Sequence, residues 1–209
     1  MTGLTNDVQT FLDELFPNPK CELNYNKDYE LVIATMLSAQ TTDKRVNMVT
    51  EVLFSKYPNL KSLSEANIND VIRIIRPIGT FNKKAKNVIS IAKRLYSECN
   101  GVVPNDREYL ESLPGVGRKT TNVVLSNIYN VPCIAVDTHV SRVSIRLGIA
   151  NEGDSPNIIE KKLELTFDKE ALCRLHHQMV LFGRYYCTAR LPKCGSCKLR
   201  KYCKESRNE

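Results

Sequence analysis

The sequence lacks any long apolar run and any sign of a targeting segment. No stretch approaches the roughly 20 apolar residues that a membrane-spanning helix requires. Residues 1–7 contain neither the basic stretch nor the apolar stretch of a secretory signal peptide. No low-complexity segment, long linker or internal repeat is evident in the 209 residues, and a chain of this size can bury one good core or two small ones. We therefore expect a folded cytoplasmic protein with no membrane partner.

Net charge is almost absent from most of the chain and is concentrated near its end. Residues 1–183 contain 22 basic and 21 acidic side chains, whereas residues 184–207 contain eight basic side chains and one acidic one. The basic side chains of this basic segment are Arg184, Arg190, Lys193, Lys198, Arg200, Lys201, Lys204 and Arg207. A positive segment on a nearly neutral body indicates a polyanionic partner, and nucleic acid fits best.

Four of the eight cysteines lie in the basic segment, at Cys187, Cys194, Cys197 and Cys203. They are close enough in sequence to converge on one metal centre. Structural disulfides are rare in a cytosolic chain. Zinc sites use two closely spaced pairs, but only Cys194 and Cys197 form one here, while iron–sulfur clusters accept more varied spacings. The spacing therefore favours a cluster and leaves zinc open. The remaining cysteines are expected to be small buried side chains: Cys21, Cys99, Cys133 and Cys173.

Helical periodicity dominates the chain, so we predict an all-α fold. Residues 31–37 are nearly all apolar and predict a helix that is buried on every side and capped by Asp28. Asp43 opens the next helix, and Ser155 with Pro156 begins a later one. The one strand-like run, residues 131–136, is weakened by Pro132. The helix over residues 85–96 is expected to carry a basic outer face: Lys83, Lys84, Lys86, Lys93 and Arg94.

A second motif runs from Leu113 to Thr120 and reads Leu-Pro-Gly-Val-Gly-Arg-Lys-Thr. A short helix ends here, Gly115 and Gly117 permit a tight turn, and an apolar helix begins. The free N–H groups of such a turn and of the next helix's N-terminus form an anion pocket that suits a DNA phosphate. An ordinary turn between two helices is the alternative. In a basic protein, the following Arg118-Lys119 pair favours phosphate binding.

Lys119 and Asp137 are the candidate chemical groups. Lys119 lies in the first turn of its predicted helix, at the positive end of the helix dipole and beside Arg118. Both effects favour the neutral amine, a nucleophile that can form a Schiff base; a simple phosphate contact is the alternative. Asp137 follows an apolar run 18 residues later. It either caps a helix over residues 140–147 or presents a carboxylate to Lys119 across a cleft.

Together these residues resemble the endonuclease III family of helix-hairpin-helix, iron–sulfur DNA glycosylases. The resemblance runs from about residue 23 to residue 203. Its features are the segment 113–120, Val-Asp-Thr-His at 136–139, Leu-Ser-Ala-Gln at 37–40, His177, Gly-Arg-Tyr at 183–185 and the spacing of the four cysteines. It implies a six-helix barrel domain, residues 22–132, that includes the helix-hairpin-helix. Residues 1–21 and 133–209 would form an iron–sulfur cluster domain, with the active-site cleft between the two.

The resemblance also implies an activity and its residues. The protein would be a bifunctional DNA glycosylase/AP lyase of base excision repair, acting as a monomer at the nucleoid on double-stranded DNA with damaged pyrimidines or abasic sites. Lys119 would attack the sugar with help from Asp137, and β-elimination would cut the strand 3′ to the lesion. The four cysteines would hold a [4Fe–4S] cluster. Gln40 would fill the gap left by the flipped base, and further DNA contacts would come from Thr80, Gly115, Gly117, Arg118, Arg190 and Lys193.

One position departs from the family, and two rival functions stay open. Relatives often carry a bulky apolar wedge where this chain has the small, polar Thr80; Phe81 is the alternative wedge, unless it belongs to the core. A monofunctional adenine DNA glycosylase is disfavoured by Lys119 and by the absence of a carboxylate from residues 31–42. A non-catalytic, redox-sensing DNA-binding protein would not need Lys119 and Asp137.

Overall fold

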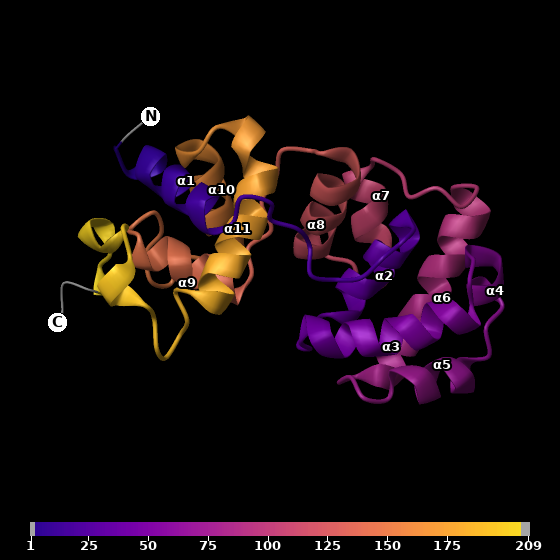
Figure 1. Cartoon of the computed structure of the whole chain (residues 1–209). Coiled ribbons are helices and arrows are strands. Elements are labelled where there is room, and N and C mark those ends of the chain that lie inside the picture. The colour runs from indigo at the N-terminus through magenta and orange to yellow at the C-terminus, as the bar shows by residue number, and fades with distance from the viewer. Residues whose placement is uncertain (1–2, 206–209) are drawn as a thin grey trace. The chain divides into compact units, whose positions relative to one another are not determined.

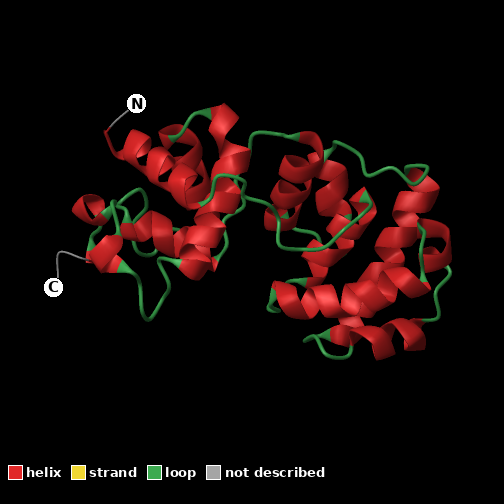
Figure 2. Ribbon diagram, in the orientation of Figure 1, coloured by secondary structure: helices red, strands yellow, loops and turns green. Residues whose placement is uncertain are grey.

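The computed structural model describes residues 3–205, and Figure 1 traces its helices along the chain. The regular elements in this range are α-helices and short 3₁₀ turns (Figure 2), which confirms the predicted all-α fold. Contacts divide the chain into two compact units. Cys21–Tyr129 forms one, and the residues up to Lys20 together with those from Asn130 form the other. None of the described helices is long and apolar enough to cross a membrane.

The unit 21–129 is built around α2 (Asp28–Leu37), which contacts α3, α6 and α8. Every residue of α2 after Asp28 is buried, which confirms the helix expected to be buried on all sides. Lys27 rather than Asp28 occupies the N-cap position, so the predicted cap is wrong by one residue. The other helices are α3 (Asp43–Lys56), α4 (Leu60–Ser64), α5 (Ile68–Ile75), α6 (Phe81–Glu98), α7 (Arg107–Ser112) and α8 (Arg118–Tyr129).

The expected basic outer face of α6 is wrong at Lys84. This residue is only 5% exposed, whereas Lys83, Lys86 and Lys93 are exposed. Lys84 lies four and seven residues before Val88 and Ile91, which are both fully buried, so the helical period turns it toward the core. A buried ammonium needs hydrogen-bond acceptors, and the carbonyl oxygens of Leu37 and Ala39 accept from it.

The other unit centres on α11 (Leu172–Tyr185), which contacts α9 (Thr138–Arg146) and α1 (Gly3–Leu15). A Cβ atom at Gly183 of α11 would lie 2.8 Å from the Cβ of His139, so only glycine lets α11 and α9 approach so closely. Pro156 begins α10 (Pro156–Thr166) with Ser155 at its N-cap, as predicted. Residues 131–136 form no strand; they run as a loop whose last four residues are buried.

Two acidic side chains of α1 pair with lysines of the basic segment. Lys201 lies 2.6 Å from the carboxylate of Asp7, and the Tyr202 hydroxyl donates to the same carboxylate at 2.8 Å. Lys198 pairs with Glu14. Two of the eight positive charges in the segment are thus offset within the unit, so the count of charges in the sequence overstates the positive charge that this end of the protein offers to a polyanion.

Candidate functional site

The segment 113–120 forms the predicted tight turn between α7 and α8. The Val116 N–H donates to the Leu113 carbonyl at 3.1 Å, and the Thr121 N–H donates to the Gly117 carbonyl at 3.0 Å. Leu113 and Val116 are buried and anchor the turn. Lys119 is exposed in the first turn of α8, immediately before the buried run 120–126. The turn therefore presents the lysine to solvent from a rigid base.

The two glycines of this turn have different structural roles. Gly115 has a φ of +80°, and a Cβ there would lie 2.4 Å from Asn87 Nδ2 and 3.2 Å from Met36 Cγ. Glycine is needed at position 115 for both reasons. Gly117 has no positive φ, and a Cβ there would meet no atom within 4 Å. The fold does not require glycine at position 117, and the space beside its backbone is open.

Asp137 is the N-cap of α9, which confirms the capping alternative as its local role. Its Oδ1 atom accepts from the N–H groups of His139 and Val140, each at 2.8 Å. Because both bonds end on Oδ1, Oδ2 remains for another partner. The carboxylate is half-buried and fixed in orientation. Lys119 and Asp137 belong to different units, and their approach to each other stays a prediction.

Gln40 and Thr80 lie on exposed turns of the unit 21–129. Gln40 follows the end of α2, and Thr80 is the N-cap of α6; both have a φ of +56°. This left-handed conformation is uncommon outside glycine and is most unusual for a β-branched residue such as threonine. Gln40 is exposed and is therefore not a buried amide at the helix end. Phe81 is half-buried, next to the turn that contains the fully enclosed Ile78.

His177 of α11 is half-buried, and burial lowers the pKa of its imidazole. The neighbouring ring of His176 lies 5.0 Å away between centroids. The neutral imidazole is the form that burial favours.

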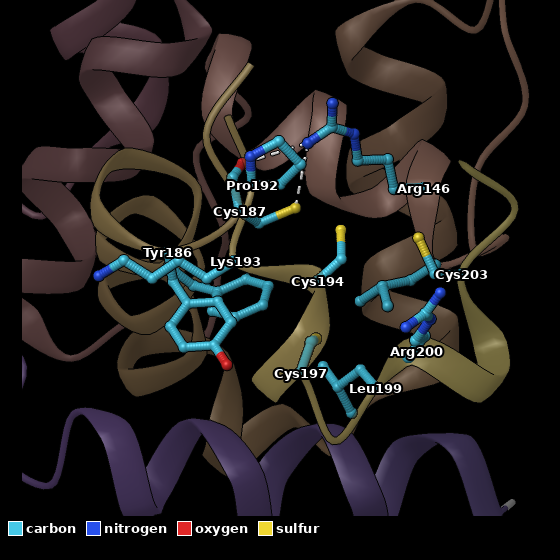
Figure 3. A pocket seen from close by; sticks show the side chains of 12 residues that line it. Arg146, Tyr186, Cys187, Pro192, Lys193, Cys194, Cys197, Leu199, Arg200 and Cys203 are labelled. Atoms are coloured by element: carbon cyan, nitrogen blue, oxygen red, sulfur yellow. Dashed lines mark hydrogen bonds between the residues drawn. The ribbon is translucent and has the colours of Figure 1, made fainter. Parts of the chain in front are cut away.

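The four cysteines of the basic segment surround one hollow, as Figure 3 shows. Cys187 follows α11, Cys194 begins a 3₁₀ turn that Cys197 follows, and Cys203 follows a second such turn. The hollow has a volume of about 390 Å³, part of it open to solvent, and its wall includes Leu147, Phe182 and Leu199. Burial raises the pKa of the Cys187 and Cys197 thiols.

Within residues 3–205 no three His, Cys, Asp or Glu side chains are grouped as the ligands of one metal ion. The four cysteine side chains nonetheless line the same hollow. The cysteines elsewhere in the chain differ from expectation: Cys133 is buried, but Cys21, Cys99 and Cys173 are only half-buried.

Arg146 of α9 holds the first cysteine and the loop that follows it. Its guanidinium donates to the Thr188 carbonyl at 2.8 Å and lies 3.3 Å from Cys187 Sγ. The loop 188–193 then projects Arg190, which is exposed. Lys193, also exposed, lies over the Tyr186 ring at 5.7 Å from its centroid. Sequence reasoning missed Arg146 because nothing in its local pattern distinguishes it from a surface arginine at a helix C-terminus.

Comparisons with known proteins agree with this arrangement. Residues 33–169 match the model of the HhH-GPD superfamily base excision DNA repair protein. The chain is 44% identical over 200 residues to endonuclease III of Rickettsia conorii, covering 96% of this chain and 95% of the relative. It is 44% identical over 194 residues to endonuclease III of Bacillus subtilis, covering 93% and 89%.

A solved structure extends the likeness to three dimensions. It is described as a trapped endonuclease III–DNA covalent intermediate, an estranged-adenine complex. It is 43% identical, covers 97% of this chain and 95% of its own, and superposes with a TM-score of 0.91. The family match and these identities over nearly the whole chain lead to one conclusion: this protein belongs to the endonuclease III family, within the HhH-GPD superfamily of base excision DNA repair proteins.

Proposed function

We propose that this protein is a bifunctional DNA glycosylase and AP lyase that removes oxidised pyrimidines from duplex DNA. The observation that carries the proposal is the exposed Lys119 at the start of α8, behind a rigid glycine turn. A related endonuclease III has been captured as a covalent intermediate with DNA. A covalent intermediate requires a nucleophile on the protein, and the amine of Lys119 supplies one.

The reaction assigned to Lys119 has two steps, removal of the base and cleavage of the strand. In the first, the neutral Nζ attacks C1′ of the damaged nucleotide, the bond from C1′ to the base breaks, and the base leaves with the electron pair. The bond between C1′ and O4′ then breaks, O4′ keeps the electron pair and takes a proton from Nζ, and Nζ and C1′ form a protonated Schiff base. In the second, a proton leaves C2′, and the bond between C3′ and its phosphate oxygen breaks. The positive Schiff base accepts the electrons of the C2′–H bond, which makes this elimination feasible.

Asp137 is assigned the electrostatic part of the first step. Its Oδ1 is held by two N–H groups of α9, so the carboxylate cannot rotate away. Oδ2 then faces the sugar, stabilises the positive charge that develops at C1′ as the base departs, and accepts a proton from the Lys119 ammonium. A preoriented charge is effective because no reorganisation is needed when the reaction occurs.

DNA is held mainly through its phosphates. The open space beside Gly117 lets a phosphate approach the backbone at the start of α8. Arg118, Arg190 and Lys193 add positive charge on exposed surface. Gln40 occupies the space left when the damaged nucleotide rotates out of the stack, which costs a few kcal/mol and least where the lesion weakens pairing. The turn at Thr80, with Phe81 after it, contacts the bases opposite the lesion.

We propose that the hollow lined by Cys187, Cys194, Cys197 and Cys203 holds a [4Fe–4S] cluster. The residues fit the group: four thiols line one hollow, and part of its wall is apolar. When bound, the cluster would supply a rigid, redox-capable link among the four cysteines. The chain's own contribution is to hold the loop 188–193 through Arg146 so that Arg190 faces the DNA.

The cluster is tested by the colour and metal content of purified protein. We expect a brown protein with visible absorption and four iron atoms per chain, a stoichiometry set by the proposed [4Fe–4S] cluster with Cys₄ ligation. Colourless protein with one zinc per chain would contradict the assignment.

We propose further that the protein has two functional domains, the barrel domain expected at residues 22–132 and the cluster domain expected at residues 1–21 with 133–209. We also propose that the protein is monomeric and that it acts at the nucleoid.

The catalytic assignment is tested by borohydride trapping. The protein is incubated with abasic-site DNA and borohydride, which reduces a Schiff base to a stable bond. We expect covalent capture by the parent and by Lys86→Gln, a control at an exposed lysine of α6, and none by Lys119→Gln. Capture by Lys119→Gln would disprove the nucleophile, and absence of capture by the parent would favour a non-catalytic DNA-binding protein.

A further inference from the structure

Three turns that we assign to DNA contact meet on one face of α6. Thr80 is the N-cap of this helix, and Lys84 and Asn87 follow four and seven residues later, so the helical period places all three on the same face. Asn87 lies beside the turn of the hairpin, because its Nδ2 is the atom that a Cβ at Gly115 would approach to 2.4 Å. Lys84, between them, reaches the turn that contains Gln40.

The Lys84 side chain holds that turn with all of its donors. Its Nζ donates to the carbonyl oxygens of Leu37 at 2.8 Å and Ala39 at 2.7 Å, and lies 3.4 Å from the hydroxyl oxygen of Thr41. An ammonium has three donors, so these three acceptors match them. Leu37 is the last residue of α2, where the negative end of the helix dipole attracts a cation.

The turn that Lys84 holds is strained at Gln40. A non-glycine residue in the left-handed region is strained, and such a conformation persists only where the surrounding structure enforces it. Lys84 binds Ala39 and Thr41, the residues on either side of Gln40. Its own backbone N–H donates to the Thr80 carbonyl at 3.0 Å. One residue therefore links the two turns whose central residues both have a φ of +56°.

We propose that Lys84 is a positioning residue, which fixes the Gln40 and Thr80 turns relative to each other so that both enter the DNA base stack together. The inference rests on the proposed function, because it takes Gln40 as the residue that fills the flipped nucleotide's place and the Thr80 turn as the contact to the opposite strand. Lys84 does not contact DNA, since it is enclosed within the unit 21–129. Burial lowers the pKa of Lys84, and the three oxygen acceptors hold the charged form.

The first test is Lys84→Met, which keeps the length of the side chain and removes the charge and the donors. Lys93→Met, at an exposed position of the same helix, is the matched control. Two rates are measured at single turnover: base excision from duplex DNA, and β-elimination at a preformed abasic site in single-stranded DNA. We expect Lys84→Met to lose roughly tenfold to a hundredfold on the duplex and to retain the single-strand rate. Lys93→Met should match the parent on both. Equal losses on both substrates, or no loss on either, would overturn the proposal.

A double-mutant cycle separates this proposal from the assignment of Gln40. If Lys84 acts through Gln40, Lys84→Met should cost much less in a Gln40→Ala background than alone. Additive losses would overturn the role of Lys84 and leave the proposed function intact. A Gln40→Ala variant as active as the parent on duplex DNA would remove the Gln40 contact and this inference with it, whereas borohydride trapping at Lys119 would be unaffected.

A measurement without DNA guards against misfolding of the variant. Lys84→Gln keeps N–H donors on a shorter, neutral side chain. Amide hydrogen exchange at Thr41, whose N–H donates to the Ser38 carbonyl at 3.0 Å, reports the order of the turn. We expect faster exchange at Thr41 in Lys84→Gln or Lys84→Met than in the parent, with unchanged exchange in the core of α8. An exchange rate at Thr41 equal to that of the parent would refute the role of Lys84 in holding the turn.

Discussion

Substitutions at Gly115 and Gly117 should separate an effect on folding stability from an effect on DNA binding. At Gly115, alanine would have to adopt a φ of +80° and place its Cβ 2.4 Å from Asn87 Nδ2. The left-handed conformation costs roughly 1–2 kcal/mol, and moving the Asn87 side chain off its rotamer adds roughly 0.5–1.5 kcal/mol. Gly115→Ala should therefore destabilise the protein by about 2–3 kcal/mol, which lowers the melting temperature by about 5–10 °C for a chain of this size.

At Gly117, alanine meets no atom and no forbidden φ. Gly117→Ala should change stability by less than about 0.5 kcal/mol. If a phosphate approaches this backbone, however, the added methyl group blocks it, and the loss of one charge-assisted hydrogen bond weakens binding to duplex DNA by about tenfold or more. Thermal unfolding and a fluorescence binding titration, run on both variants at one salt concentration, decide the matter. An unchanged melting temperature for Gly115→Ala would refute the packing argument, and parental affinity for Gly117→Ala would refute the phosphate site.

Three further predictions follow from the same structure. Asp137→Asn keeps the capping oxygen and removes the charge, so base excision should fall by orders of magnitude with little change in melting temperature; retained excision would reduce Asp137 to a helix cap. Arg190→Ala should reduce the slope of log affinity against log salt by about 0.9, the contribution of one phosphate contact, and an unchanged slope would exclude that contact. Because burial lowers the pKa of His177 in the folded protein, the same imidazole in the unfolded chain binds a proton first as the pH falls below about 6.5. The free energy of unfolding should therefore decrease as the pH falls from about 6.5 to the lower pKa of the folded state. Urea titrations at pH 7.5 and 5.5 should show a smaller decrease for His177→Gln than for the parent.

Much of the fold was predictable because apolar residues follow the helical period. The buried α2 could be read from its near-continuous apolar run, and the start of α10 from Ser155 and Pro156. The capping role of Asp137 could be predicted because a carboxylate before a helical stripe satisfies free N–H groups whatever the rest of the protein does. Such local signals survive into the folded state unchanged.

The features that sequence missed depend on distant parts of the chain. Lys84 was assigned to the surface from its charge, although its position in the stripe of Val88 and Ile91 points inward; its acceptors lie more than 40 residues earlier. Gly115 and Gly117 look alike in sequence, and only the neighbours of their Cα atoms distinguish them. The spacing of the cysteines left zinc open because distances between sulfur atoms come from the fold.

The separation of α1 from the rest of its unit has a consequence for synthesis. The ribosome releases α1 first, yet its partners lie far along the chain: the hydrogen bond between Asp7 and Tyr202 spans 195 residues. The unit 21–129 is continuous and can fold as soon as it emerges, as domains generally do during translation. Val8, Phe11 and Leu12 belong in the finished protein to one apolar cluster with residues of α9, α10 and α11, which are synthesised after the unit 21–129. The nascent protein thus passes through a stage in which its first helix exposes an apolar face, and the later helices, α11 above all, cover it.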